Sequence, residues 1–338
     1  MSAKITDKFN IRTNELLCAN VTPMEDSFDF GLFFNSTETR SLEYNKLFKE
    51  RAIEYSILVD FKNEESNLKK INLKSNQDNL SLKSKKYEIL HIDDIFNYQD
   101  NLNKIVTSIP KNLFKLNARF FIDITGAPLI YSVALIRYFK LSFPSPILYL
   151  LNVSSDYNSK ENPQFSEGIR ENIFIPGYYG KPNHSKPKLY VFLLGYEGER
   201  SLNILKTNDP DFVEVIIPAP GYEEGNPQKT VDKNKEFLKE IGFIDKELVI
   251  ENGFTDKIIK VPIGNPEEVA NTVLSLYEKY SKIADVRLVL PSCPKPHAIG
   301  AGLAAIAEEN ISIMYQTPKE YKMEDYAAGE KMWIYVIK

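Results

Sequence analysis

Cysteine and histidine are scarce in this chain of 338 residues, which contains two cysteines and three histidines. Two cysteines cannot build a disulfide framework, so we expect a reducing compartment and assign the protein to the cytoplasm. The histidines are far apart in the sequence and show no spacing typical of a zinc site. We therefore expect no metal site, and no other cofactor is indicated.

Long apolar runs and nucleotide-binding signatures are also absent. No segment approaches the roughly 20 apolar residues of a membrane helix, and the polar residues 1–20 lack the core of a signal peptide. The G-x-G-x-x-G and G-x-x-x-x-G-K patterns are missing, which disfavours the usual NAD and ATP sites. A net charge of −4 argues against broad nucleic-acid binding.

Apolar strand segments alternate with helical segments along the chain. The predicted strands cover residues 28–34, 55–61, 87–91, 119–124 and 147–153 in the first half, and 189–194, 212–217, 258–263, 286–290 and 311–315 in the second. Such alternation requires parallel pairing with right-handed crossovers. The sequence therefore predicts an α/β protein of two tandem Rossmann-like three-layer domains, residues 1–186 and 187–338.

Three segments lie outside this regular pattern. Residues 1–27 show little periodicity and are expected to form an extension. The polar, Lys-rich residues 63–86 indicate an exposed insertion, either a loop or a ragged hairpin. Residues 175–183 are rich in Pro, Gly and Tyr, which is typical of a linker.

The two halves repeat one another in sequence. Arg40, followed by Ser and Leu, matches Arg200 in the same context, and Arg119 matches Arg287 at nearly the same offset. Near the end of the first half, residues 172–175 echo residues 333–337 at the end of the second. The common order of these matches favours an internal duplication.

The ends of the first strands carry the first candidate site residues. Arg40 and Arg200 each lie at a helix start, where a guanidinium group adds charge to free N–H groups and suits a phosphate or carboxylate. The alternative is an exposed arginine that pairs with Glu43 or Glu199. The neighbouring turn residues Asn35, Ser36, Gly195 and Glu197 are included in the predicted ligand site.

The ends of the fourth strands carry the remaining candidates. Asp123, Thr125 and Gly126 can bind ribose hydroxyls or a phosphate, although a turn whose Thr caps the next helix is the alternative. In the second half, the stretch from Leu290 to Gly300 reads as a strand, a Pro-rich turn and a small-residue helix. This turn offers a possible nucleophile, an anion contact and a proton-transfer group, which are Cys293, Lys295 and His297. Neighbours on a turn often point apart, so only Lys295 is favoured as a ligand contact.

The turn that begins at Asp123 resembles a known family. Asp-Ile-Thr-Gly before a small-residue helix resembles the CARF domains of CRISPR-associated effectors, in which the turn commonly reads Thr-Gly-Gly-Thr-Lys. The second half retains Lys295 without a glycine pair, and Ala127 and Pro128 replace Gly-Thr in the first. Two such units in one chain resemble the SAVED domains of bacterial anti-phage systems. The resemblance implies that a cyclic oligonucleotide or related nucleotide binds between the lobes, and that a partner protein carries the effector activity.

Three functions fit these observations. The first is a nucleotide-sensing module of a prokaryotic defence system. The second is an enzyme that acts on a nucleotide or phosphorylated sugar by glycosyl or phosphoribosyl transfer or by hydrolysis, with Asp123 or Glu197 as acid or base. The third is a non-catalytic interaction subunit. The residues leave this choice open, together with the ligand, the partner and the oligomeric state.

Overall fold

The protein consists of two compact lobes. The computed structural model describes residues 4–62, 66–155, 166–243, 258–322 and 328–338. The first lobe comprises Phe9–Glu167 and Glu320–Lys338, and the second lobe comprises Met1–Lys8 and Gly168–Lys319. Each lobe thus takes two segments of the chain, whereas the sequence predicted a single boundary between residues 186 and 187.

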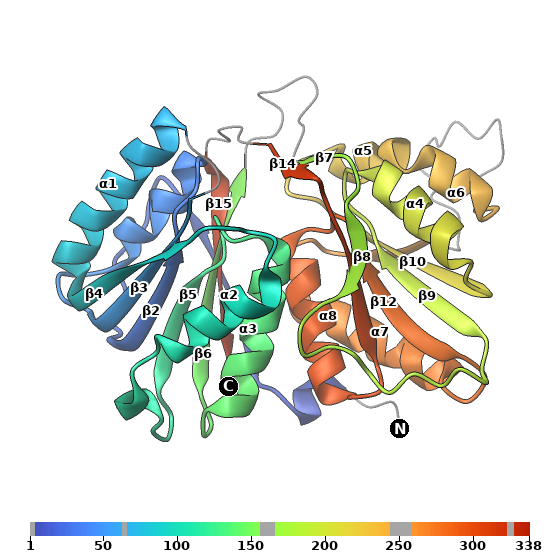
Figure 1. Ribbon diagram of the computed structural model, residues 1–338, viewed down its shortest axis with the longest axis horizontal. Helices are drawn as coiled ribbons and strands as arrows, with labels where there is room; N and C mark the ends of the chain where they lie inside the picture. The colour runs from blue at the N-terminus through green and yellow to red at the C-terminus, as the bar shows by residue number, and fades with distance from the viewer. Residues whose placement is uncertain (1–3, 63–65, 156–165, 244–257, 323–327) are drawn as a thin grey trace. The chain divides into compact units, whose positions relative to one another are not determined.

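The first lobe is built on a seven-stranded sheet with the order β1-β15-β6-β5-β2-β3-β4 (Figure 1). Strands β2 to β6 pair in parallel, and β15 is antiparallel to both β6 and β1. The strands are β1 (Ile11–Leu17), β2 (Phe28–Phe34), β3 (Ile53–Phe61), β4 (Ser84–Ile92), β5 (Arg119–Asp123), β6 (Ile147–Ser155) and β15 (Ala328–Ile337), with a small ribbon of β7 (Ser166–Glu167) and β14 (Glu320–Tyr321). The strand order reverses between β2 and β5, which is where Rossmann-like sheets bind ligands.

Helices cover both faces of this sheet because its central strands are apolar on both sides. The helical segments are η2 (Thr39–Leu47), α1 (Asn67–Lys83), α2 (Tyr98–Thr107), η3 (Lys111–Leu113) and α3 (Leu129–Ser142). Neighbours on a strand point to opposite faces. Accordingly the ring centroids of Phe121 and Phe48, which follows η2, lie 4.6 Å apart on one face of the sheet. The ring centroids of Phe120 and Phe139 of α3 lie 4.8 Å apart on the other face. The predicted three-layer arrangement is confirmed in this lobe.

The second lobe repeats the plan with a six-stranded sheet of order β11-β10-β9-β12-β13-β8. Its strands are β8 (Glu171–Phe174), β9 (Lys188–Leu193), β10 (Phe212–Pro218), β11 (Ile258–Val261), β12 (Asp285–Leu290) and β13 (Ser312–Thr317). Its helices are η1 (Ile5–Asp7), α4 (Gly198–Asn208), α5 (Asn226–Lys233), α6 (Lys235–Glu240), α7 (Pro266–Tyr280) and α8 (Lys295–Ala307). Helices α4 to α6 pack on one face, where the Phe237 ring lies 4.7 Å from Phe192, and α7 and α8 cover the other (Figure 1).

The two sheets share one topology, as the repeated sequence pattern predicted. Five parallel strands in the same order are followed in each by an antiparallel sixth strand at the edge of the parallel set. Each sixth strand, however, comes from the other half of the chain as the sequence analysis divided it. Residues 171–174 pair with β13 of the second lobe, and residues 328–337 pair with β6 of the first. Both segments have the same apolar pattern, so nothing local in the sequence distinguishes the two pairings.

The three irregular segments are also integral parts of the lobes. The supposed extension contains β1 and η1. The supposed linker buries Ile175 and Tyr178 within the second lobe. The supposed polar insertion forms α1 and the start of β4, while its residues 63–65 lie outside the described residues. Helix α1 gave no helical signal because its buried face is mainly polar.

The first prediction tests the packing of the N-terminal segment. Ile5 is fully buried in the second lobe, and its backbone N–H donates to Asn271 Oδ1 at 2.8 Å. Removing a buried aliphatic side chain typically costs about 2–5 kcal/mol, so Ile5→Ala should lower the free energy of unfolding of this lobe by that amount. The control Ile283→Ala, at a site in the same lobe that is 57% exposed, should change it by less than about 0.5 kcal/mol. Equal urea midpoints for the two variants would contradict the docking of residues 4–8.

Candidate functional site

A buried arginine fastens the first strand-to-helix turn in both lobes. Arg200 Nη1 donates to the carbonyl oxygens of Pro291 at 3.0 Å and Gln316 at 3.2 Å, and its Nε lies 3.5 Å from Glu197 Oε2. In the first lobe, Arg40 donates to the Val153 carbonyl and pairs with Glu38. Both arginines therefore link the turn after the first strand to the end of the fifth. They are buried and pair with Glu38 and Glu197, whereas the alternative predicted arginines that are exposed.

The turns after the first and fourth strands touch one another through a glycine. A Cβ atom at Gly126 would lie 2.9 Å from the Phe34 carbonyl oxygen, and one at Gly195 would lie 2.0 Å from that of Ser292. Such close approach admits only glycine at these two positions. The structure thus brings the predicted turn residues together at the switch point of each sheet. In the second lobe, the Glu197 N–H also donates to Ser292 Oγ at 3.1 Å.

Asp123 and Thr125 are occupied by local hydrogen bonds. Asp123 Oδ1 accepts from the Thr125 N–H at 2.8 Å, and Thr125 Oγ1 accepts from the Val153 N–H at 3.2 Å. Both residues are at most 2% exposed. This arrangement stabilises the turn and ties β5 to the end of β6.

Cys293 and His297 lie inside the second lobe. Burial raises the pKa of the Cys293 thiol well above its usual range, so the thiol stays protonated at neutral pH and is a poor nucleophile. Burial also lowers the pKa of His297 to about 4, which keeps this imidazole neutral. Its Nε2 lies 3.4 Å from the Pro262 carbonyl oxygen, and its Nδ1 has no partner among the described residues. Lys295, the first residue of α8, is only partly buried.

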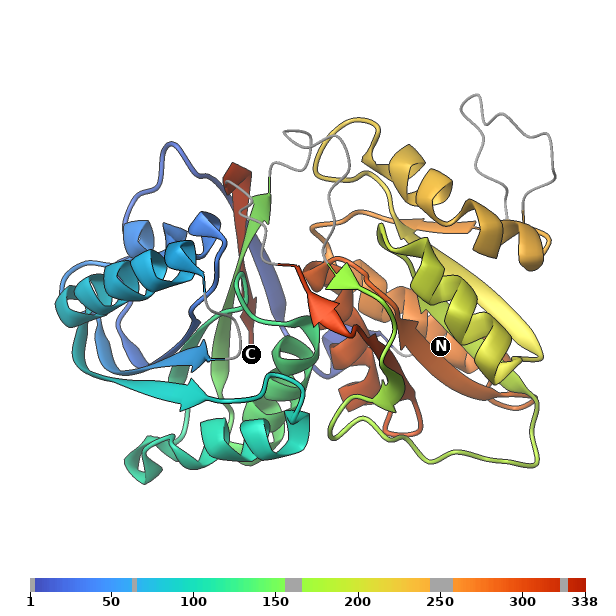
Figure 2. The same cartoon turned by 45° about the horizontal axis from the view of Figure 1, so that its top comes forward.

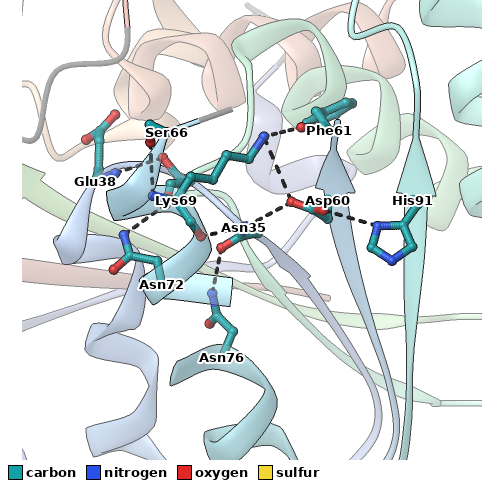
Figure 3. Close-up of polar contacts among 10 residues, drawn as sticks. Asn35, Glu38, Asp60, Phe61, Ser66, Lys69, Asn72, Asn76 and His91 are labelled. Atoms are coloured by element: carbon teal, nitrogen blue, oxygen red, sulfur yellow. Dashed lines mark hydrogen bonds and ion pairs between the residues drawn. The ribbon is translucent and has the colours of Figure 1, made fainter. Parts of the chain in front are cut away.

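A cluster of polar side chains lies around Asp60 near the end of β3 (Figure 3). Asp60 Oδ1 accepts from Asn35 Nδ2 at 2.8 Å and lies 3.9 Å from Lys69 Nζ. Asp60 Oδ2 lies 3.1 Å from Nδ1 of His91, the next-to-last residue of β4. Lys69 also donates to the Phe61 carbonyl. One buried carboxylate is thus surrounded by an amide, an ammonium and an imidazole.

Helix α1 supplies the supporting side chains of this cluster. Ser66 caps the helix by accepting from the Lys69 N–H at 3.0 Å. Asn72 Nδ2 donates to the Ser36 carbonyl at 2.9 Å, and Asn76 Nδ2 donates to Asn35 Oδ1 at 3.2 Å. Asn35 and Ser36, two residues of the predicted ligand site, therefore belong to this cluster.

Sequence reasoning did not identify Asp60, Lys69 or His91. Asp60 is the one acid in the apolar segment of β3, and His91 ends the third predicted strand, so parallel pairing could have placed them at one edge. The spacing of Lys69, Asn72 and Asn76 is helical, but a polar face gives no hydrophobic periodicity.

The described residues contain no group of three or more His, Cys, Asp or Glu side chains that could hold a metal ion. Within the same ranges, no helix has the length and apolar character needed to cross a membrane.

Comparison with known proteins does not assign the chain to a family. No family model matches the chain, and no curated protein matches it. One similar solved structure is the adenylation, ketoreductase and pseudo Asub multidomain structure of a keto acid-selecting NRPS module, at 9% identity and a TM-score of 0.22. The match covers 87% of this chain but only 30% of that one. A likeness this distant carries no argument about fold or function.

The buried arginines generate a stability prediction. Breaking a buried ion pair typically costs about 3–5 kcal/mol because the remaining charge loses its partner, so Arg200→Ala should destabilise the second lobe by that amount. Arg170→Ala is the matched control, since Arg170 pairs with Glu171 at 3.8 Å but its side chain is 47% exposed. Exposed pairs contribute less than about 1 kcal/mol. Chemical unfolding of both variants should show this difference. Similar losses of stability in the two variants would refute the stabilising role of the buried Arg200.

The buried His297 generates a pH prediction. Its pKa is about 4 in the folded state, against 6.5 for an unperturbed histidine. Between these values the unfolded state binds a proton that the folded state does not, so stability falls as the pH drops. The loss should reach about 2 kcal/mol between roughly pH 7.5 and pH 5, at 1.36 kcal/mol per pH unit.

Urea unfolding at several pH values measures this effect. His297→Gln should flatten the dependence on pH between about 6.5 and 4, whereas His184→Gln at an exposed site should leave it unchanged. An unaltered pH dependence in the His297 variant would show that this imidazole does not contribute.

Proposed function

We propose that the first lobe binds a nucleotide, or a related phosphorylated ligand with free hydroxyls, at the carboxyl-terminal edge of its parallel sheet. The observation that carries the proposal is the Asp60 cluster, where a buried carboxylate contacts the partly exposed ring of His91. Figure 2 brings this edge of the lobe forward. An acidic residue at the end of the second strand accepts a ribose hydroxyl in many Rossmann folds, and Asp60 has that topological position.

The charges of the cluster favour a hydroxyl over a phosphate at Asp60 itself. The carboxylate is already compensated by Lys69, at 3.9 Å from Oδ1. A neutral hydroxyl can add a hydrogen bond there without adding a buried charge, whereas a phosphate next to Asp60 would be repelled. The phosphate of the ligand is therefore expected outside the cluster. The proposal does not depend on Arg40 or Arg200, whose guanidinium groups bond to backbone carbonyls.

The resemblance to CARF and SAVED domains narrows the ligands worth testing. Cyclic oligonucleotides are the ligands that it implies, and they present several ribose units. We further propose that the protein acts in the cytoplasm of a prokaryote as a sensor in anti-phage defence, with its output in a partner protein. Both cysteines are free and buried, which suits a reducing compartment.

Calorimetric titration with a panel of nucleotides tests this function. The panel contains adenosine monophosphate, cyclic di- and tri-adenylate, and the 2′-deoxy form of each. At least one ribonucleotide should bind, and Asp60→Asn should weaken it roughly tenfold or more, since a hydrogen bond to a charged group contributes about 1.5–3 kcal/mol. Asp78→Asn, at an exposed position on α1, is the control and should bind like the wild type.

The outcomes separate the candidate functions. Absence of binding across the panel, or equal binding by Asp60→Asn, would refute the proposed site and favour an interaction subunit. Chromatography of the same mixtures after prolonged incubation detects turnover, which would distinguish an enzyme from a sensor.

A further inference from the structure

The three histidines of this chain have different environments. His297 is fully buried without a carboxylate partner. His184 is exposed, and no carboxylate among the described residues pairs with it. His91 alone combines an accessible ring, 43% exposed as a side chain, with a carboxylate whose side chain is only 10% exposed. Its Nδ1 lies 3.1 Å from Asp60 Oδ2.

The environment of Asp60 fixes the tautomer of this imidazole. Asp60 Oδ1 accepts from the Asn35 amide at 2.8 Å and lies 3.9 Å from Lys69 Nζ, while Oδ2 faces the imidazole. An ionised carboxylate only accepts hydrogen bonds, so the proton of the neutral ring is on Nδ1. The lone pair is then on Nε2, and the His91 side chain has no other hydrogen bond among the described residues. This is the arrangement in which a carboxylate orients a histidine for proton transfer.

We infer that His91 is a proton acceptor and Asp60 its positioning residue, so that Nε2 takes the proton of a hydroxyl group on the bound ligand. The hydroxyl oxygen keeps the electron pair of its O–H bond and becomes a nucleophile. The ring becomes an imidazolium whose charge Asp60 compensates. This step rests on the proposed ligand site, but the activation of the imidazole can be measured without any ligand.

The supporting contacts make the arrangement more than a surface pair. Asn76 holds Asn35 at 3.2 Å, and Asn35 holds Asp60 Oδ1, so α1 and the turn after β2 both restrain the carboxylate. A surface ion pair gains little because both side chains must be ordered. Here the contacts with Asn35 and Lys69 restrain the Asp60 side chain independently of His91. This lowers the entropic cost of the pair and keeps Nε2 at one position.

Carbethoxylation by diethylpyrocarbonate measures the reactivity of each histidine. Nε2 bonds to a carbonyl carbon of the reagent, ethyl carbonate departs, and the ring then loses its Nδ1 proton. Peptide mass spectrometry gives the rates at His91 and His184 in the same sample, near neutral pH. His91 should react faster than His184 despite its lower exposure.

The substitution Asp60→Asn isolates the role of the carboxylate. It should reduce the ratio of the His91 rate to the His184 rate about fivefold, the factor that corresponds to the ~1 kcal/mol between hydrogen bonds to charged and to neutral partners. Asp78→Asn should leave the ratio unchanged, and circular dichroism checks that both variants fold. A His91 rate no higher than that of His184, or an unchanged ratio in Asp60→Asn, would overturn the inference.

A protection experiment tests the ligand hydroxyl separately. A ribonucleotide that binds in calorimetry should slow carbethoxylation of His91 but not of His184, and its 2′,3′-dideoxy analogue at equal occupancy should protect less. Equal protection by the two would overturn the assignment of the hydroxyl to Nε2. If no nucleotide binds, the proposed function fails, while the rates in free protein still decide whether Asp60 activates His91.

Discussion

Both lobes depend on one constraint at the carboxyl-terminal edge of a parallel sheet. Carbonyl groups at strand ends need donors, and a buried arginine provides them in each lobe, from Arg40 to Val153 and from Arg200 to Pro291 and Gln316. Each arginine belongs to the helical segment after the first strand, so the bond also fixes the turn that precedes it. This turn also lies against the turn after the fourth strand, a close approach that Gly126 in the first lobe and Gly195 in the second allow.

The repeated framework carries different chemistry in its two copies. An asparagine from the region after the second strand donates to the first turn in both, since Asn72 bonds to the Ser36 carbonyl and Asn234 to the Gly195 carbonyl at 2.7 Å. Asp60 and His91 have no counterpart, because the ends of β10 and β11, residues 217–219 and 261–263, contain only Ala, Ile, Pro and Val. The second lobe has the buried arginine but no counterpart of the Asp60 carboxylate, which is why the proposed site belongs to the first lobe.

The sequence allowed prediction of the features whose signals are local. Apolar segments located the parallel strands. The start of α7 also has a local signal, since Asn265 stands directly before Pro266 and its side chain accepts from the Glu268 N–H at 3.1 Å. Features that depend on distant pairing were not predictable. The two sixth strands have interchangeable apolar patterns, so only the folded chain shows that β15 pairs with β6. Likewise Asp60 and His91 are separated by a whole helix in the sequence, and only adjacent parallel strands bring them together.

The buried face of helix α1 is mainly polar. This face supports the proposed site, and it is also the reason why the sequence analysis did not predict the helix. An apolar face on this helix would have given a clear helical signal and a simpler core, but it would remove the Asn72 donor from the Ser36 carbonyl and the Lys69 ammonium from the Asp60 carboxylate. Unsatisfied buried groups cost about 1–3 kcal/mol each, and more when charged. Lys69 and Asn72 make those contacts, and Asn76 holds Asn35, which itself donates to Asp60, so burying these side chains offsets a cost that Asp60 creates. A buried carboxylate and a polar helix face therefore require one another, and the helix that looks like a solvated insertion in the sequence is the part of the lobe that holds Asp60 in place.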